Sequence, residues 1–511
     1  SMKQVKQIVA ARNSVINTAD TANHENNPAW TKPDSELLEQ FAMTGTLGNS
    51  FYASAKENTE NAVELLERCD ADAIASAIVK GRNEGFIRTF PLLGLVFLSK
   101  KDPEQFKAVF PQVVKTGNDL GDFIDLCKSM RGLGRSVKNA ISSWLAARTS
   151  DYYAQKYRTQ LADAIRLVRF RGDCDPIFGY VLAGYGDRVK GWTAEKEQAA
   201  YEKYPNLRAH RDFIAAIEAG KNAVACNILE KHKLDVDSLT AHYDKFDAAI
   251  WREIARLSPV MRFLKYLDKF DRSGVFRRGI SLAEEKLTVA NFQKARVFPF
   301  RLYTAYANIS NSAVKNHLAA VLDEYAAAYD WGAFNAYSWA VCPDVSGSMQ
   351  AVCSGKLTFS DIAGMFTGFF AKGLKDCRII PWSDRVFKWD VPRNDSIITH
   401  IRELKRLNGG TDMSCALRAM IAGNIKRDFL VFITDTEEYG RRYRGGSSWI
   451  EAWIEYRRRV NSRAQAFVLR SDSGITNPFP EADAKKYGVY PVYGWNDNVA
   501  KYMQYVVESN R

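Results

Sequence analysis

The chain is poor in the nitrogen and sulfur side chains that build many catalytic and metal sites. Its 511 residues include 8 cysteines and 6 histidines. No two cysteines form a Cys-x-x-Cys pair, which argues against structural zinc and fits reduced thiols. The histidines are too scattered to indicate an acid/base or metal constellation, and no Gly-x-Ser-x-Gly elbow is present. Zinc sites and serine hydrolase chemistry therefore have little support.

Long hydrophobic runs are also missing. The longest apolar stretch, Phe90–Leu98, contains Pro91 and Gly94 and is far shorter than the ~20 residues that span a bilayer. No leader of charged, then apolar, then small residues opens the chain. We expect a cytoplasmic protein that makes no membrane contact.

Charged residues are common in the chain, and they are distributed unevenly along it. The formal net charge is +12, which favours polyanionic partners without naming one. Residues 128–171, here called the basic stretch, hold ten Lys or Arg but only two acidic residues, for a local charge of +8. Such a run is either a solvated helix face or a surface for phosphates.

The chain divides into two kinds of pattern. From Ser35 to about Ala328, apolar residues recur at helical spacing, as in Ile141, Trp144 and Leu145. No repeat of fixed length emerges, but short helices in antiparallel pairs suit a divergent HEAT-like solenoid, and a generic bundle is the alternative.

After residue 332 the pattern alternates between strands and helices, which predicts a doubly wound α/β domain. We expect strands at 338–343, 378–382, 429–433 and 464–469, an edge-type strand at 385–391, and helices at 358–374, 397–407, 415–425 and 450–459.

Three segments of this second part supply oxygen donors. Asp344-Val345-Ser346-Gly347-Ser348 follows one expected strand, Thr434-Asp435-Thr436-Glu437 follows another, and Gly409-Gly410-Thr411-Asp412 precedes a helix. Carboxylates and hydroxyls without sulfur or imidazole suit a hard divalent cation, with Mg²⁺ expected first and Mn²⁺ or Ca²⁺ as alternatives. The candidate ligands are Asp344, Ser346, Ser348, Thr411 and Asp435.

These segments resemble the metal-ion-dependent adhesion site of the von Willebrand factor A fold, with its pattern D-x-S-x-S, then T, then D. A helical part followed by such a domain resembles the Ro autoantigen family, whose helical part is the TROVE module. Three further segments are similar to family motifs: Phe41–Thr46, Gly134–Ile141 and Lys294–Phe300, the last with Phe298 in place of a usual histidine. The resemblance predicts a TROVE-like domain at 3–335 and a von Willebrand factor A-like domain at 336–511.

The resemblance implies a non-enzymatic, monomeric RNA-binding protein for RNA quality control. In this family the solenoid closes into a ring, Y RNA lies on a basic outer surface, and single-stranded ends of misfolded noncoding RNA enter the central hole. It implies partners such as Y-like small RNA and a 3′-to-5′ exoribonuclease of the polynucleotide phosphorylase type. The expected RNA contacts are Arg131, Arg135, Lys138, Lys156, Arg158, Arg166 and Arg169.

Two rival functions stay open. A cation-dependent protein-binding module would use the metal site to recruit an acidic ligand, and the basic surface would then be incidental. A hydrolase would use Ser346 or Ser348 as nucleophile, but the nearest downstream histidine, His400, lies in an ordinary helical pattern.

The aromatic residues within the basic stretch could serve either the core or RNA binding. Trp144 falls on an apolar helix face and is expected in the core. Tyr152, Tyr153 and Tyr157 could either stack on unpaired bases or fill the core.

Overall fold

The computed structural model describes residues 15–22, 28–44, 55–85, 87–170, 175–183, 191–297, 299–435, 448–470, 476–494 and 497–509. Five positions discussed above lie outside the described residues: Gly45, Thr46, Phe298, Thr436 and Glu437. Arg171, the last residue of the basic stretch, also lies outside them. The chain forms two compact units. Unit 1 comprises residues 1–65, 287–308 and 312–511, and unit 2 comprises residues 66–286 and 309–311.

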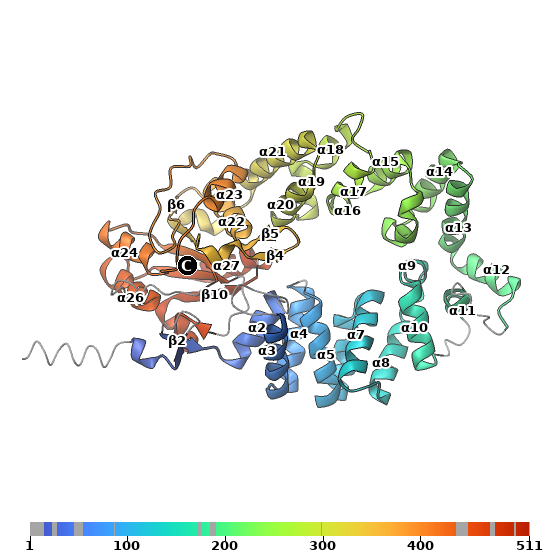
Figure 1. The fold of residues 1–511 in the computed structure, drawn as a ribbon, viewed down its shortest axis with the longest axis horizontal. Coiled ribbons are helices and arrows are strands. Elements are labelled where there is room, and N and C mark those ends of the chain that lie inside the picture. Colours follow the sequence, from blue (N-terminus) through green and yellow to red (C-terminus); the bar gives the residue numbers. More distant parts are fainter. Residues whose placement is uncertain are drawn as a thin grey trace, which may run out of the picture. The chain divides into compact units, whose positions relative to one another are not determined.

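Unit 2 is built from helices that pack on their neighbours along the chain. For example, α5 packs against α4, α6 and α7, and α14 packs against α13 and α15 (Figure 1). The helices are α4 (Ala71–Asn83), α5 (Thr89–Lys101), α6 (Pro103–Val113), α7 (Gly117–Met130), α8 (Arg135–Ala146), α9 (Asp151–Lys156), α10 (Arg158–Val168), α11 (Pro176–Ala183), α12 (Ala194–Lys203), α13 (Pro205–Glu218), α14 (Asn222–His232), the 3₁₀ segment η2 (Val236–Lys245), α15 (Ala248–Leu257), α16 (Val260–Lys265), α17 (Leu267–Arg272) and α18 (Ser281–Lys286).

Local sequence signals begin several of these helices. Asp102 accepts hydrogen bonds from the backbone at the start of α6, where Pro103 occupies the first turn. Thr116 and Asp119 form a capping box at the start of α7, in which each side chain accepts from the other residue's backbone N–H. These signals are readable without any tertiary contact.

The centre of unit 1 is a five-stranded sheet in which every pairing is parallel, in the order β10-β8-β7-β3-β6. The strands are β3 (Trp339–Pro343), β6 (Cys377–Ile379), β7 (Phe429–Thr434), β8 (Gln465–Arg470) and β10 (Val489–Tyr493). The accompanying helices are α22 (Phe359–Gly373), α23 (Ile397–Lys405), α24 (Cys415–Ala422), α26 (Trp449–Arg459) and α27 (Asp497–Ser509).

Both faces of the sheet are covered, as a parallel sheet requires. On one face, Trp339 of β3 stacks on Phe429 of β7 at 4.7 Å and on Phe370 of α22 at 6.5 Å between ring centroids. On the other face, Cys342 and its neighbours share a buried cluster with Trp453 of α26 and with residues of α24. Strand residues therefore alternate between two helical layers.

Unit 1 also contains elements from the first part, the middle and the last part of the chain. They are α2 (Asp34–Thr44), most of α3 (Ala55–Arg68), α19 (Val289–Ala295), α20 (Pro299–Asn308), α21 (Ser312–Ala328), the hairpin strands β4 (Val352–Ser354) and β5 (Leu357–Thr358), and the 3₁₀ segments η1 (Val15–Thr18), η3 (Gly332–Ala336), η4 (Gly347–Gln350) and η5 (Glu481–Tyr487). A small antiparallel sheet joins β1 (Thr21–Ala22), β2 (Pro28–Thr31) and β9 (Thr476–Asn477). The first described strands thus pair with a segment near the end of the chain.

A buried polar cluster reinforces this pairing. Glu36 of α2 accepts hydrogen bonds from the Asn477 side chain at 3.1 Å and from the Tyr493 hydroxyl. Arg470 donates to the same Asn477 at 2.5 Å, and Lys32 bonds Gln40. Burial raises the pKa of Glu36 to about 7, although Lys32 and Arg470 oppose the shift.

The expected alternation of strands and helices is confirmed in outline, and two details were wrong. The edge-type strand at 385–391 is absent, because only Val386 makes a bridge, with Trp382, and the residues after it leave the edge of the sheet. The strand expected at 378–382 is shortened to β6. The parallel strand β10 was not among the expected strands; it is an edge strand, where the missing N–H of Pro491 is tolerated.

Compact units and sequence domains are different divisions. The predicted domain boundary lies between residues 335 and 336, which would place α19–α21 in the helical domain. The contacts instead group α19–α21 with the sheet in unit 1. The boundary stays a prediction. In the described part of the chain, no helix combines the length and the hydropathy that crossing a bilayer requires.

Candidate nucleic-acid interface and candidate metal centre

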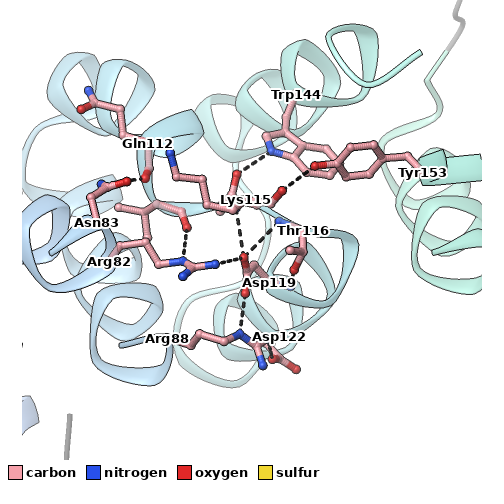
Figure 2. A network of polar contacts seen from close by, with 12 residues as sticks. Arg82, Asn83, Arg88, Gln112, Lys115, Thr116, Asp119, Asp122, Trp144 and Tyr153 are labelled. Carbon is pink, nitrogen blue, oxygen red and sulfur yellow. Dashed lines mark hydrogen bonds and ion pairs between the residues drawn. The ribbon is translucent and has the colours of Figure 1, made fainter. Parts of the chain in front are cut away.

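The corner between α6 and α7 holds together the helices of the basic stretch. Carbonyl groups near the end of a helix have no partner within it and need donors from elsewhere. Four successive carbonyls here accept from side chains of other helices (Figure 2): Gln112 from Asn83 at 3.2 Å, Val113 from Arg82 at 3.1 Å, Val114 from Trp144 at 2.8 Å, and Lys115 from Tyr153 at 2.6 Å. The donors lie on α4, α8 and α9, so one corner fixes the relative positions of three helices.

Asp119 is the centre of the same network. Its fully buried carboxylate accepts from Arg82 at 2.9 Å and from Arg88 at 2.6 Å, and also from the backbone N–H groups of Lys115 and Thr116 (Figure 2). Burial opposes ionisation of Asp119, but the hydrogen bonds from Arg88 and Arg82 outweigh it and hold its pKa below the ordinary value. Arg82 and Arg88 therefore serve the fold.

Helix α8 presents two of the predicted RNA contacts to solvent. Arg135 and Lys138 are exposed, while Val137 and Ile141 of the same helix are buried. Residues three apart lie on one helix face, so the two cations form a pair. Neither makes an ion pair with an acidic residue in the described ranges. Arg169 is also exposed, at the left-handed residue that ends α10.

Two other predicted contacts already have partners in the fold. Arg131 donates to the hydroxyl of buried Ser99 at 2.7 Å. Arg166 is paired with Asp163, three residues before it, at 3.3 Å on the surface of α10. A surface pair of this kind is weak, so Arg166 can exchange Asp163 for a phosphate at small cost.

Lys156 and Arg158 are more deeply engaged. Lys156 makes a 3.1 Å ion pair with Asp237 and lies 5.4 Å from the ring centre of Tyr157. Arg158 donates to the carbonyls of Tyr180 and Val181, near the end of α11. Its guanidinium also lies 4.4 Å from the ring centre of Tyr180. These two cations connect α9 and α10 to neighbouring segments of unit 2.

The aromatic side chains form an internal cluster. Trp144 is 2% exposed, which confirms its expected place in the core. Tyr157 is 4% exposed and packs against Tyr152 and Tyr153 with ring centroids 6.1 and 5.5 Å away. Tyr157 is therefore a core residue, while Tyr152 and Tyr153 are only partly buried.

Sequence reasoning passed over Lys128, which was inside the basic stretch but was not selected. It is exposed in the last turn of α7 and lines a surface cavity of about 510 Å³ together with Gln160 and Arg166 of α10. Helical spacing alone could not show this, because the cavity needs two helices that only the fold brings together.

The candidate metal ligands gather at one edge of the sheet in unit 1. Asp344 follows β3 and Asp435 follows β7, and these strands are parallel neighbours with Pro343 opposite Ile433. Asp344, Ser346, Ser348, Thr411 and Asp435 are all buried. The hydroxyls of Ser346 and Ser348 lie 3.1 Å apart.

Asp344 is held in place before any cation arrives. It accepts from the backbone N–H of Ser346 at 2.8 Å and from the hydroxyl of Thr434 at 2.7 Å. Burial raises the pKa of Asp344 to about 6, and the hydrogen bonds from Ser346 and Thr434 act against that rise. Thr434 lies in one of the three predicted oxygen-donor segments but was not chosen as a site residue, and its contact with Asp344 is seen only in the fold.

The segment Gly409–Asp412 contributes one candidate ligand to the site, Thr411, and not a second one from Asp412. The Asp412 carboxylate is bonded by Arg418 at 2.5 Å and by the Ser414 hydroxyl at 2.6 Å, so Thr411 is left as the donor. Gly409 brings the segment close, since its carbonyl accepts from Gly347 N–H at 3.1 Å. A Cβ at Gly409 would lie 2.2 Å from the Ser383 hydroxyl.

This donor set fits a hard cation and depends on hydroxyl groups. In the part of the chain that the structure describes, no three His, Cys, Asp or Glu side chains form a cluster that could hold a metal. Two carboxylates and three hydroxyls are oxygen donors of the kind that Mg²⁺ and Ca²⁺ accept. The residues are therefore compatible with the predicted cation.

Comparison with known proteins finds a relative by sequence and a similar solved structure. No family model matches the chain. The chain is 24% identical over 302 residues to the "RNA-binding protein RO60" of Deinococcus radiodurans. The aligned part covers 54% of this chain and 54% of that protein, so the match spans about half the length of each.

The structural match is wider. The crystal structure of the Deinococcus radiodurans RO (RSR) protein superposes with a TM-score of 0.65, covering 94% of this chain and 100% of that chain. At 19% sequence identity this likeness establishes the fold. The helix-rich architecture with a parallel five-stranded sheet is thus shared with that protein.

Proposed function

We propose that this chain, which is homologous to the Ro protein of Deinococcus radiodurans, is an RNA-binding protein. The observation that carries the proposal is the sequence match to a protein described as RNA-binding, and the shared fold supports it. Exposed Arg135 and Lys138 on α8 supply the chemistry, because cations without acidic partners can neutralise phosphates and release counterions.

The predicted RNA contacts fall into two groups in this proposal. Arg135, Lys138 and Arg169 bind phosphate directly, since they are exposed, and Arg166 joins them by leaving its weak pair with Asp163. The remaining three, Arg131, Lys156 and Arg158, mainly hold the helices that present these cations.

The identity of the RNA belongs to the same proposal. By resemblance to the Ro family, the basic surface binds a Y-like small RNA, and ends of misfolded RNA enter a ring for delivery to a 3′-to-5′ exoribonuclease. Closure of the helical solenoid into a ring is part of this proposal, and the pairing of β2 with β9 within unit 1 supports it.

The oxygen-rich site is proposed as a divalent cation site of a von Willebrand factor A-like domain. Asp344, Ser346, Ser348, Thr411 and Asp435 would hold the ion, with Mg²⁺ first. When bound, the cation would supply an open coordination position for a carboxylate from outside. We assign no catalytic role to any residue.

RNA sequencing and a comparison of RNA affinities test the main proposal. RNA that copurifies with the chain is sequenced and labelled, and its affinity is measured for the natural chain and for Arg135→Glu/Lys138→Glu. The matched control is Arg458→Glu/Arg459→Glu, which changes the net charge equally at exposed residues of α26 in unit 1. Selective loss in the α8 variant supports the proposal, and equal affinity in all three proteins would contradict it.

One observation favours a second function. The convergence of a buried carboxylate and two hydroxyls after β3 suits a cation that recruits an acidic protein ligand. In that case Asp344→Ala would abolish binding of a protein partner, and no discrete RNA would copurify with either form.

A further inference from the structure

A cavity of about 500 Å³ lies beside β6, the last strand at one edge of the sheet. Its walls come from β6, from residues 386–391, and from α22, α23 and the end of α24, all within unit 1. The volume falls in the range of small-molecule sites. No step proposed above uses this cavity.

The cavity exists because residues 386–391 leave the edge of the sheet. Val386 bridges to Trp382, and the N–H of Phe387 donates to the Pro381 carbonyl at 2.9 Å. Beyond Phe387 the segment forms no strand and makes no ladder with β6. Space therefore remains between Ile379 and the segment, and both line the cavity.

Two aromatic side chains in this cavity carry polar atoms that lack partners. The indole N–H of Trp389 and both ring nitrogens of His400 are buried, without a hydrogen-bond partner in the described part of the chain. His400 is 0% exposed, and its ring stacks on Trp389 with centroids 5.8 Å apart. Leaving such groups unpaired costs about 1–3 kcal/mol each, so a ligand that reached them from the cavity would gain hydrogen bonds that the fold does not supply.

Burial lowers the pKa of His400 and so favours the neutral imidazole, although Asp395 acts against the shift. A neutral imidazole offers one donor and one acceptor, and the indole adds a second donor. The wall thus presents a mixed hydrogen-bonding edge beside an aromatic face.

The rim of the cavity is cationic. It includes Arg378, Lys388 and Arg393 against one acid, Asp390. Lys388 is paired with Asp390 at 2.9 Å, and Arg393 donates to backbone carbonyls, including that of Ala371 at 2.8 Å. Exposed Arg378 makes no ion pair in the ranges that the structure describes.

We propose that this cavity binds a nucleotide, with the base against Trp389 and His400 and the phosphate at Arg378. Bases combine a flat aromatic face with edges that alternate donors and acceptors, and stacking on an aromatic side chain tolerates any base. A guanidinium suits the phosphate, which it can bind through two parallel hydrogen bonds. The source is either a free mononucleotide or the end of an RNA.

This site goes beyond the proposed RNA surface, because it uses no residue of unit 2. Binding of AMP is therefore measured by calorimetry on the full chain carrying Arg135→Glu/Lys138→Glu, so that the α8 cations cannot contribute. Trp389→Phe removes the indole N–H and keeps a ring, and Arg378→Gln removes the exposed charge. Arg406→Gln, at an exposed residue after α23 that does not line the cavity, is the matched control.

We expect AMP to bind saturably, and each cavity substitution to weaken it by about fivefold to tenfold, while the control binds like its parent. In a second outcome, AMP shows no binding while a short single-stranded oligonucleotide binds and loses affinity in the same two variants. That result would support the nucleotide site and identify RNA as the source of the nucleotide. If neither probe binds, or if binding is equal in all variants, the proposal is overturned and the cavity holds only water. Arg378→Gln changes an exposed side chain, so the test survives even if Trp389→Phe fails to fold.

Discussion

Replacing Asp119 with asparagine is expected to loosen the helices that present the candidate RNA surface. The substitution keeps the shape of the side chain but removes its charge from a fully buried position. Arg82, whose side chain is only 14% exposed, would then be a largely buried cation without a charged partner. Breaking a buried ion pair in this way costs about 3–5 kcal/mol.

Asp122→Asn is the matched control, because it makes the same chemical change three residues away. Asp122 is 61% exposed, and its 2.9 Å pair is with Arg88, which is itself 45% exposed. A surface pair of this kind is worth about 0–1 kcal/mol. The two variants therefore differ in burial and not in chemistry.

Hydrogen exchange measured by mass spectrometry suits this comparison, because a chain with two units need not unfold in one step. Peptides covering residues 103–146 report the opening free energy of α6, α7 and α8. We expect Asp119→Asn to exchange far faster there than Asp122→Asn, with little change in peptides from the sheet of unit 1. Equal exchange in the two variants would refute the reasoning.

The pH dependence of the effect has a defined sign. The pKa of Asp119 is lowered in the folded chain from an ordinary value of 3.8. Its contribution is therefore complete above that value and is lost as the pH falls through the folded-state pKa. The difference between the natural chain and Asp119→Asn should shrink in strong acid and stay constant from pH 6 to pH 8.

Further predictions concern the remaining sites. Arg135→Glu/Lys138→Glu should weaken RNA binding by on the order of tenfold or more and reduce the slope of log affinity against log salt by about two, measured by fluorescence anisotropy. Mg²⁺ should raise the thermal unfolding temperature of the natural chain but not that of Asp344→Ala, and an equal rise in both would exclude the proposed site. Burial raises the pKa of Glu36 from 4.5 to about 7, so it should make stability fall as the pH rises through that interval, whereas Glu36→Gln should show a flatter profile in thermal unfolding.

Much of the α/β part was predictable because its signals are local. Phe429–Ile433 is apolar throughout, which is typical of a strand buried on both faces, and β7 spans Phe429–Thr434. Likewise, the helix expected at 450–459 is α26, which Ser448 begins through a capping box with Glu451. Both patterns depend on neighbours within a few residues.

Edge positions were predicted less well, for a physical reason. Val386, Phe387 and Trp389 are residues that favour strands, so a strand was expected at 385–391. Whether an edge segment pairs depends on backbone partners that its own sequence does not name. The same uncertainty hid β10, where Pro491 is tolerated because no strand in the described residues pairs on its outer side.

For the candidate sites, the sequence determined residue types and order, and the tertiary structure decided which side chains are available. The spacing of Asp344, Ser346 and Ser348 was readable because one turn brings them together. In contrast, Lys156 and Arg135 look alike in the basic stretch, yet only the fold pairs Lys156 with Asp237 and leaves Arg135 exposed. Glu36 meets Asn477 across 441 residues of chain, a contact that no local pattern encodes, since it arises only when distant segments share one core.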